Sequence, residues 1–193
     1  MLVKIARKHP VVFGMVISSI KTSLVDLLVQ VQIEERSFQE INWKRNFLFG
    51  SFGLVYLGGV QYFIYVPLFR TLFPRTEMYS KLSFREKIHH PARKEILLQV
   101  VMDQMIHHPF IYFPCFYATK EIINHPKLSL SKNIKNGFEK YTANYSEDLT
   151  SLWKIWIPAT MFNFLLSPLW MRIPVTATFS ILWTAIISKM RGD

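Results

Sequence analysis

The side chains best suited to chemistry lie in one apolar window of the sequence, residues 96–119. Gln99, Asp103 and His107 recur there at intervals of four residues, so a helix would carry all three on one stripe. Gln104 adjoins Asp103. A carboxylate, an imidazole and amides held together away from water could line a proton or ion path, or join helices through hydrogen bonds.

A second set of polar residues lies inside the other apolar stretches. Asp26 and Gln30 are four residues apart. Asn163 lies within an apolar run, and Arg172 follows Pro168. Two interpretations stay open: the groups line a narrow path for small solutes or ions, or an Asp–Arg pair and amide hydrogen bonds fix helix packing. The candidate polar lane or intramembrane pairing comprises Asp26, Gln30, Gln99, Asp103, Gln104, His107, Asn163 and Arg172.

Enzymatic and metal-dependent chemistry find little support in the sequence. Two His-His-Pro triplets occur, at 89–91 and 107–109, but adjacent histidines on an α-helix point about 100° apart and do not easily share one metal. Cys115 has no base beside it in sequence and suits a structural thiol. No phosphate loop, nucleophile elbow or carboxylate dyad is present. We therefore expect no catalytic residues, no bound metal and no enzyme.

The composition indicates the kind of element that must hold these residues. The chain has 193 residues, 50% of them hydrophobic, and a net charge of +10. Such an apolar chain is not disordered, and its length favours one domain. A nucleic-acid partner is not expected, because the basic residues flank apolar stretches instead of gathering on one soluble face. We expect a single integral membrane domain over residues 1–193.

The spacing of charges predicts membrane helices. Residues 46–69 carry no charge, residues 96–119 carry only Asp103, and residues 10–33 carry only Lys21 and Asp26. Each window has the roughly 20 residues that a helix needs to cross about 30 Å of hydrocarbon. The fourth stretch, 155–188, is longer and is interrupted by prolines. The prediction is an all-α bundle of four to five membrane-buried helices at about 10–33, 46–69, 96–119, 153–167 and 170–188.

One connection between the windows has the pattern of an amphipathic helix. Leu130, Ile134, Phe138 and Tyr141 fall on one helical face within residues 128–145, with lysines around them. The segment is either an interfacial helix on the membrane surface or a packed loop helix in solution. Membrane lipids are the expected partners, and a bound phospholipid such as cardiolipin fits the basic flanks. The basic N-terminus lacks the pattern of a cleavable signal, so we expect internal targeting.

A set of residues spread along the whole chain carries a family pattern. Small glycines in the second window let helices approach closely, and tryptophan and proline recur near the C-terminus. The pattern-bearing residues are His9, Pro10, Asp26, Gln30, Arg45, Gly50, Gly53, Gly58, Tyr65, Leu68, Asp103, Gln104, Pro109, Trp156, Asn163, Phe164, Pro168, Arg172, Trp183 and Ser188.

On these residues the chain resembles the Mpv-seventeen family, also named for the twenty-two-kilodalton peroxisomal membrane protein. The departures from the family pattern are Lys21, Ile64, Ile157 and Thr160. The resemblance implies family packing roles for Pro10, Gly50, Gly53, Gly58, Trp156, Phe164, Pro168 and Trp183.

The resemblance implies a compact multi-span protein without known enzymatic chemistry. Relatives resemble weakly selective channels involved in mitochondrial homeostasis, which implies a multi-pass protein of the mitochondrial inner membrane, with the peroxisomal membrane as the alternative location. A second function stays open. The chain could be a structural accessory (supernumerary) subunit of a large inner-membrane assembly such as a respiratory-chain complex, bound to that complex's other subunits.

Overall fold

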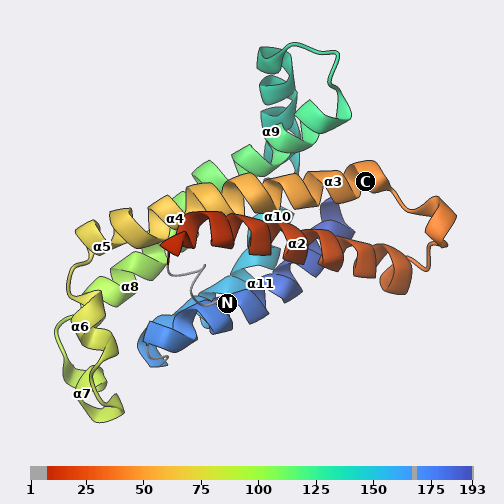
Figure 1. Cartoon of the computed structure of the whole chain (residues 1–193). Helices are drawn as coiled ribbons and strands as arrows, with labels where there is room; N and C mark the ends of the chain where they lie inside the picture. Colours follow the sequence, from red (N-terminus) through yellow and green to blue (C-terminus); the bar gives the residue numbers. More distant parts are fainter. Residues whose placement is uncertain (1–7, 167–168, 193) are drawn as a thin grey trace.

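Long helices form the framework of the chain in the computed structural model (Figure 1), which describes residues 8–166 and 169–192. Phe164 and Arg172 lie in helices, but their side chains are outside the description. The described residues contain no strand, so the all-α prediction is confirmed.

The chain path runs back and forth along five helical rods within the described ranges. Three rods are composite, because each combines α-helical segments with wider π-helical ones. The rods are Pro10–Leu28 (α2) with Val29–Ile33, Trp43–Phe52 (α3) through Gln61–Phe63 (α4) to Phe69–Leu72 (α5), Arg93–Met102 (α8) to Phe113–Asn124 (α9), Leu130–Leu166 (α10), and Leu169–Arg191 (α11). Two short helices, Thr76–Ser80 (α6) and Phe84–His89 (α7), join the second rod to the third.

Local sequence signals set several helix starts. Pro10 is at the first position of α2, where its missing N–H costs nothing. The Asn42 side chain caps α3 by accepting from the Arg45 backbone N–H. Ser83 with Glu86 forms a capping box at α7. These signals explain why the helices begin at these residues.

The second and third rods contain wide π-helical turns. They cover Gly53–Val60, Ile64–Leu68 and Asp103–Tyr112. In a π-turn the hydrogen bond runs to residue i+5, and such turns are often found at functional sites. Pro67 and Pro109, which lack the N–H donor, lie inside two of the segments.

Close packing of α2 against the second rod depends on two glycines. A Cβ on Gly58 would overlap the Met15 backbone, and one on Gly53 would overlap Ser18 and Thr22 of α2. The other side of α2 is open: Val16, Ile20 and Leu24 are exposed there. This apolar outer face suits contact with lipid chains.

Two helices in the described part of the chain are long and apolar enough to cross a membrane. They are Pro10–Ile33, with a mean hydropathy of 1.7, and Trp43–Leu72, with 1.5. The third rod does not pass the same test, and Gln99, Asp103, Gln104 and the two histidines lie in it. These two helices match the predicted windows 10–33 and 46–69, whereas the predicted bundle of four to five membrane-buried helices is not confirmed.

The amphipathic segment is not a separate helix, and the predicted boundary before residue 153 is wrong. Helix α10 runs without interruption from Leu130 to Leu166 and passes through Pro158. No glycine or proline lies between Tyr145 and Leu152, so nothing ends the helix there. The break expected at Pro168 falls at 167–168, outside the described residues, between the end of α10 and the start of α11.

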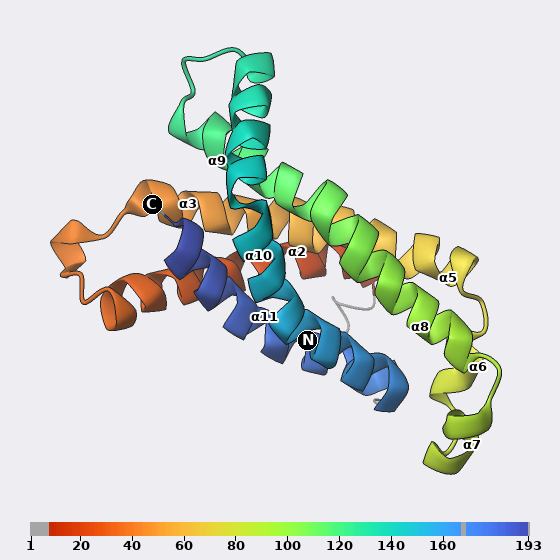
Figure 2. The same ribbon diagram turned by 180° about the vertical axis from the view of Figure 1, so that it is seen from behind.

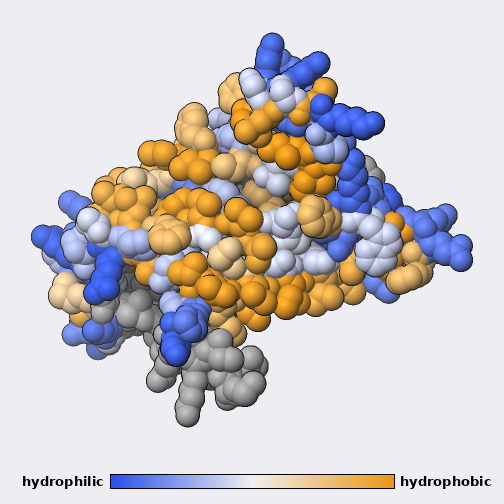
Figure 3. Space-filling model, turned by 45° about the horizontal axis from the view of Figure 1, so that its top comes forward, coloured by the Kyte–Doolittle hydropathy of each residue, from blue (hydrophilic) through white to orange (hydrophobic). Residues whose placement is uncertain are grey.

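The core lies between the rods and is mostly aromatic. Rings of α3, α9, α10 and α11 interlock there, for example Phe52 with Phe116 at 5.3 Å between ring centroids. On the reverse side, α8, α10 and α11 lie in front of α2 and α3, and the tips of α9 and α10 project from the body (Figure 2). On the face shown in Figure 3, apolar side chains cover the middle and hydrophilic ones gather at the extremities. This distribution is typical of a membrane-embedded bundle.

Candidate functional site

The Asp103 carboxylate is the centre of a buried polar cluster in the third rod. Only 1% of Asp103 is exposed. One carboxylate oxygen, Oδ1, accepts the Tyr65 hydroxyl at 2.7 Å and lies 2.8 Å from His107 Nδ1. The other, Oδ2, accepts the Gln104 amide at 2.8 Å. The α4–α5 region thus contributes Tyr65 to a site built on the π-helical turn.

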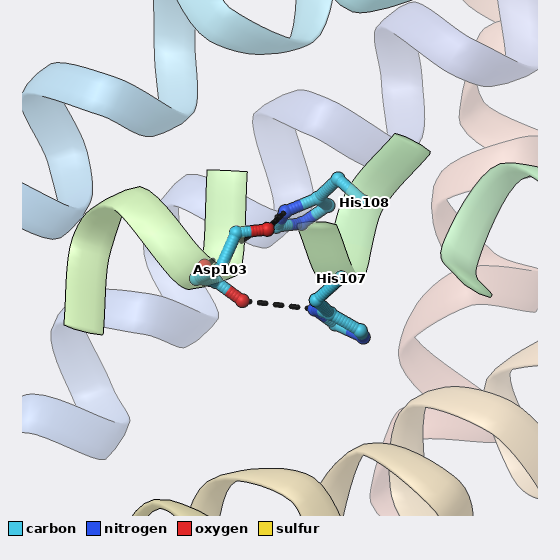
Figure 4. Close-up of side chains that lie close together, drawn as sticks. All are labelled: Asp103, His107 and His108. Carbon is cyan, nitrogen blue, oxygen red and sulfur yellow. Dashed lines mark hydrogen bonds and ion pairs between the residues drawn. The ribbon is translucent and has the colours of Figure 1, made fainter. Parts of the chain in front are cut away.

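Both histidines of the second His-His-Pro triplet flank this carboxylate (Figure 4). His108 Nδ1 lies 2.7 Å from the Asp103 carbonyl oxygen and 3.8 Å from Oδ2. The wide turn brings residue i+5 as well as residue i+4 back over residue i. The α-helical spacing assumed from the sequence therefore does not hold here, and the reasoning missed His108. One ligand atom from each of Asp103, His107 and His108 can lie within 4.8 Å of the other two, so the group could hold a metal ion.

The cluster extends into the aromatic core. His107 Nε2 lies 2.9 Å from the Tyr56 hydroxyl. The Trp153 indole donates to the backbone oxygen of Gln104 at 3.0 Å, which ties α10 to the wide turn. Among the described residues the side-chain oxygen of Gln104 has no hydrogen-bond partner, and neither has that of Gln99, which lies one turn before Asp103. The cluster is thus rich in donors and leaves acceptors unused.

Asp26 is the centre of a second, separate cluster between α2, α3 and α11. It is fully buried and accepts Arg45 Nε at 2.8 Å and Ser188 Oγ at 2.7 Å. Gln30 and Asn46 donate to its other oxygen at 2.9 and 3.1 Å. The carboxylate is therefore fully satisfied within the protein.

Arg45 supplies the positive charge of this cluster. Its guanidinium also donates to both Glu34 oxygens and to the Ser188 backbone oxygen. The sequence reasoning placed Arg45 only at the edge of a window and took Arg172 as the available cation. The family pattern, which includes Arg45, was the signal that could have identified it. The Arg172 side chain lies outside the described part.

The other predicted residues lie apart from these clusters. Asn163 donates to Thr176 Oγ1 at 2.8 Å and links α10 to α11. The Trp183 indole donates to the Tyr112 hydroxyl at 2.9 Å, and Trp156 is buried in the core. The structure thus brings Asp26 together with Gln30, and Asp103 with Gln104 and His107, but does not merge them into one lane.

A third cluster joins α9, α10 and α11 at their polar end, and sequence reasoning missed it. Asp148 is fully buried, accepts the Tyr117 hydroxyl at 2.7 Å and accepts Arg191 Nε at 2.8 Å. Burial raises the pKa of the Asp148 carboxyl, and the hydrogen bond from Tyr117 and the charge of Arg191 oppose that rise. No spacing signal marks the three residues, because they come from three helices.

Part of the chain is similar to a family of known proteins. The sequence model of the Mpv17 / PMP22 family matches residues 128–188. Residues 128–188 are thus similar to that family, and residues 1–127 lie outside the match. The match confirms the resemblance seen in the sequence, and with the two long apolar helices it supports an integral membrane protein.

Two fungal proteins are similar to about half of the chain. Protein SYM1 of Candida albicans is 30% identical over 92 residues, which are 48% of this chain and 45% of the relative. Protein SYM1 of Debaryomyces hansenii is 29% identical over 94 residues, 49% of this chain and 44% of the relative. The matches therefore span about half the length of these curated relatives. No solved structure matches the chain.

The segment similar to the Mpv17 / PMP22 family covers all of α10 and most of α11. It contains Asp148, Asn163 and Trp183, and its last residue is Ser188, which closes the Asp26 cluster. Asp26, Arg45 and Asp103 precede it in the chain. The family segment thus meets the Asp26 cluster at its last residue and reaches the Asp103 cluster through Trp153.

Proposed function

We propose that the chain is a non-enzymatic protein of the mitochondrial inner membrane that provides a weakly selective path for small solutes. The observation that carries the proposal is the burial of Asp103 among Tyr65, Gln104 and two histidines, inside a bundle whose outer face is apolar. An ionisable residue at the centre of a membrane helix costs about 2.5–3.5 kcal/mol on insertion scales. Such a residue therefore needs either strong partners or a function.

Hydrogen bonds close the polar interior in the described conformation. Asp26 is paired with Arg45, and Asp103 is surrounded by donors. Two hollows of about 380 and 250 Å³ lie elsewhere, one between α9 and α10 and one beside Cys115, and neither is lined by Asp26 or Asp103. In this proposal the described conformation is a closed state, and conduction requires the hydrogen bonds within the clusters to open.

Reconstitution of the full chain into planar bilayers tests the proposal. Purified protein should give discrete conductance steps that are absent from mock-purified membranes. A folded, clean preparation without conductance would remove the permeation function. The localisation part is tested separately by fractionating mitochondria from peroxisomes and probing each with a tagged chain.

The second candidate is an accessory subunit of a large inner-membrane assembly. It is favoured by large apolar side chains that stay exposed: 70% of Phe110 and 65% of Phe47 are accessible. Partner subunits could cover such faces as well as lipid can. Extraction in a mild detergent followed by native gel electrophoresis separates the two functions, because a subunit would migrate in stoichiometric amount with a large complex.

A further inference from the structure

The π-helical turn gathers a set of metal ligands. Asp103, His107 and His108 each offer an atom within 4.8 Å of the others, and each residue is at most 4% exposed. The wide turn is what makes this possible, since it places residues i+4 and i+5 on either side of residue i. Two imidazoles and a carboxylate are ligands that bind Zn²⁺ and other divalent first-row transition metals.

A fourth donor is adjacent and unused. The side-chain oxygen of Gln104 is fully buried and has no hydrogen-bond partner in the described part of the chain, while the nitrogen of the same amide donates to Asp103 Oδ2. A buried acceptor without a partner costs about 1–3 kcal/mol. A half-turn of this amide would direct the oxygen instead of the nitrogen toward Asp103 Oδ2, where a cation would give it a partner.

The surroundings provide the outer contacts that metal sites use. His107 uses Nδ1 toward Asp103, and its Nε2 lies 2.9 Å from the Tyr56 hydroxyl. Tyr65 donates to the carboxylate itself. Contacts of this kind orient ligands and usually accompany metal-binding imidazoles and carboxylates.

We propose that Asp103, His107 and His108, with the Gln104 oxygen, bind one divalent cation of the Zn²⁺ class. Bonds of about 2.0–2.1 Å at a tetrahedral metal put its ligand atoms roughly 3.3 Å apart. His107 Nδ1 and Asp103 Oδ1 are now 2.8 Å apart. They need to separate by about half an ångström as the cation takes the place of the hydrogen between them. His108 Nδ1, now 3.8 Å from Asp103 Oδ2, needs to approach by a similar distance and to give up its contact with the Asp103 carbonyl oxygen. The proposal does not depend on the proposed solute path.

The first His-His-Pro triplet provides a matched control. His89 is exposed, and His90 Nδ1 accepts the Ala92 backbone N–H at 3.2 Å. The two triplets have the same residue types, so if any pair of adjacent histidines bound metal, both triplets would bind it. Only the second triplet has the buried carboxylate.

The test is titration of the chelator-treated full-length protein in detergent with Zn²⁺ by calorimetry and with Co²⁺ by visible absorption. One cation should bind per chain, and tetrahedral Co²⁺ should give intense bands. His108→Gln should weaken binding at least tenfold, as should Asp103→Asn, whereas His89→Gln/His90→Gln should leave it unchanged. Circular dichroism and gel filtration verify that each variant is folded.

X-ray absorption at the zinc edge of the wild-type protein keeps the test independent of variant folding. Two imidazole rings and oxygen donors around one zinc would support the site. Absence of stoichiometric binding, binding lost only in the His89/His90 variant, or a spectrum without imidazole scattering would overturn it.

Discussion

At the scale of single residues, Arg45 holds three helices together through one guanidinium. It is 2% exposed and bonds to Asp26 and Glu34 of the first rod and to Ser188 of α11. Gly192 lies against its side chain so closely that a Cβ there would overlap the guanidinium. The C-terminal end of α11 is thus fixed to the start of the second rod.

Replacing Arg45 should destabilise the fold strongly. Arg45→Gln leaves the buried Asp26 carboxylate without its cation, and breaking a buried pair from one side costs about 3–5 kcal/mol. The double variant Asp26→Asn/Arg45→Gln should recover part of that loss, because no lone charge remains. Thermal unfolding in detergent measures both.

The control for Arg45 is Arg75→Gln, which removes an exposed pair with Glu95. Exposed pairs contribute about 1 kcal/mol or less. Equal melting temperatures for Arg45→Gln and Arg75→Gln would contradict the role assigned to Arg45.

Residue types in the sequence indicated the polar clusters but not their partners. Asp26 with Gln30 and Asp103 with His107 follow from helical spacing alone. Arg45, Asn46, Ser188 and Tyr65 come from other helices, so their contacts depend on packing that no local pattern encodes. His108 was missed for a different reason, since its position depends on a change of helix type at Asp103.

At the scale of elements, the contact between α2 and the wide turn Gly53–Val60 depends on side-chain size. Gly58→Ala should separate the two rods, because the added methyl overlaps the Met15 backbone. Overpacking of this kind costs about 1–3 kcal/mol. Gly50→Ala is the matched control, since its Cβ would lie 3.7 Å from Ser23 in ordinary contact. Equal melting temperatures for the two variants would contradict this packing.

Three large apolar side chains on the first part of α10 face outward. Leu130, Ile134 and Phe138 are exposed, while Gly137 and Tyr141 pack on α9. An environment-sensitive dye on a cysteine at position 138, with Cys115 replaced by alanine, should report an apolar setting in vesicles containing anionic lipid. The same dye at Lys135, which is exposed on α10, should report water. Identical spectra at the two positions would contradict an interfacial location.

The element boundaries show what sequence patterns can supply. The windows at 10–33 and 46–69 predicted the first two rods to within three residues, because uninterrupted apolar runs mark them. Helix α10 was divided wrongly, because the change from an amphipathic to an apolar pattern was taken as the end of a helix. The residue composition changes within α10, but the backbone stays helical from Leu130 to Leu166.

At the scale of the whole molecule, the ends of the rods define two polar sides. Ser188 and Lys189 lie near Glu34, and Arg191 lies near Asp148, so the C-terminus shares a side with the 34–42 connection. If every rod crosses the membrane, single cysteines at Ser37 and Ser129 should be labelled from one side and one at Ser83 from the other. Labelling of all three from one side would contradict five crossings.

The measurement that tests the account most directly is ion selectivity of the reconstituted chain before and after Asp103→Asn. The side chain keeps its size and loses its charge, so the conducting protein should show a changed reversal potential across a salt gradient. Glu139→Gln, an exposed change on α10, should leave the reversal potential as it was. A folded Asp103→Asn protein that conducts with unchanged selectivity would contradict a path lined by this carboxylate.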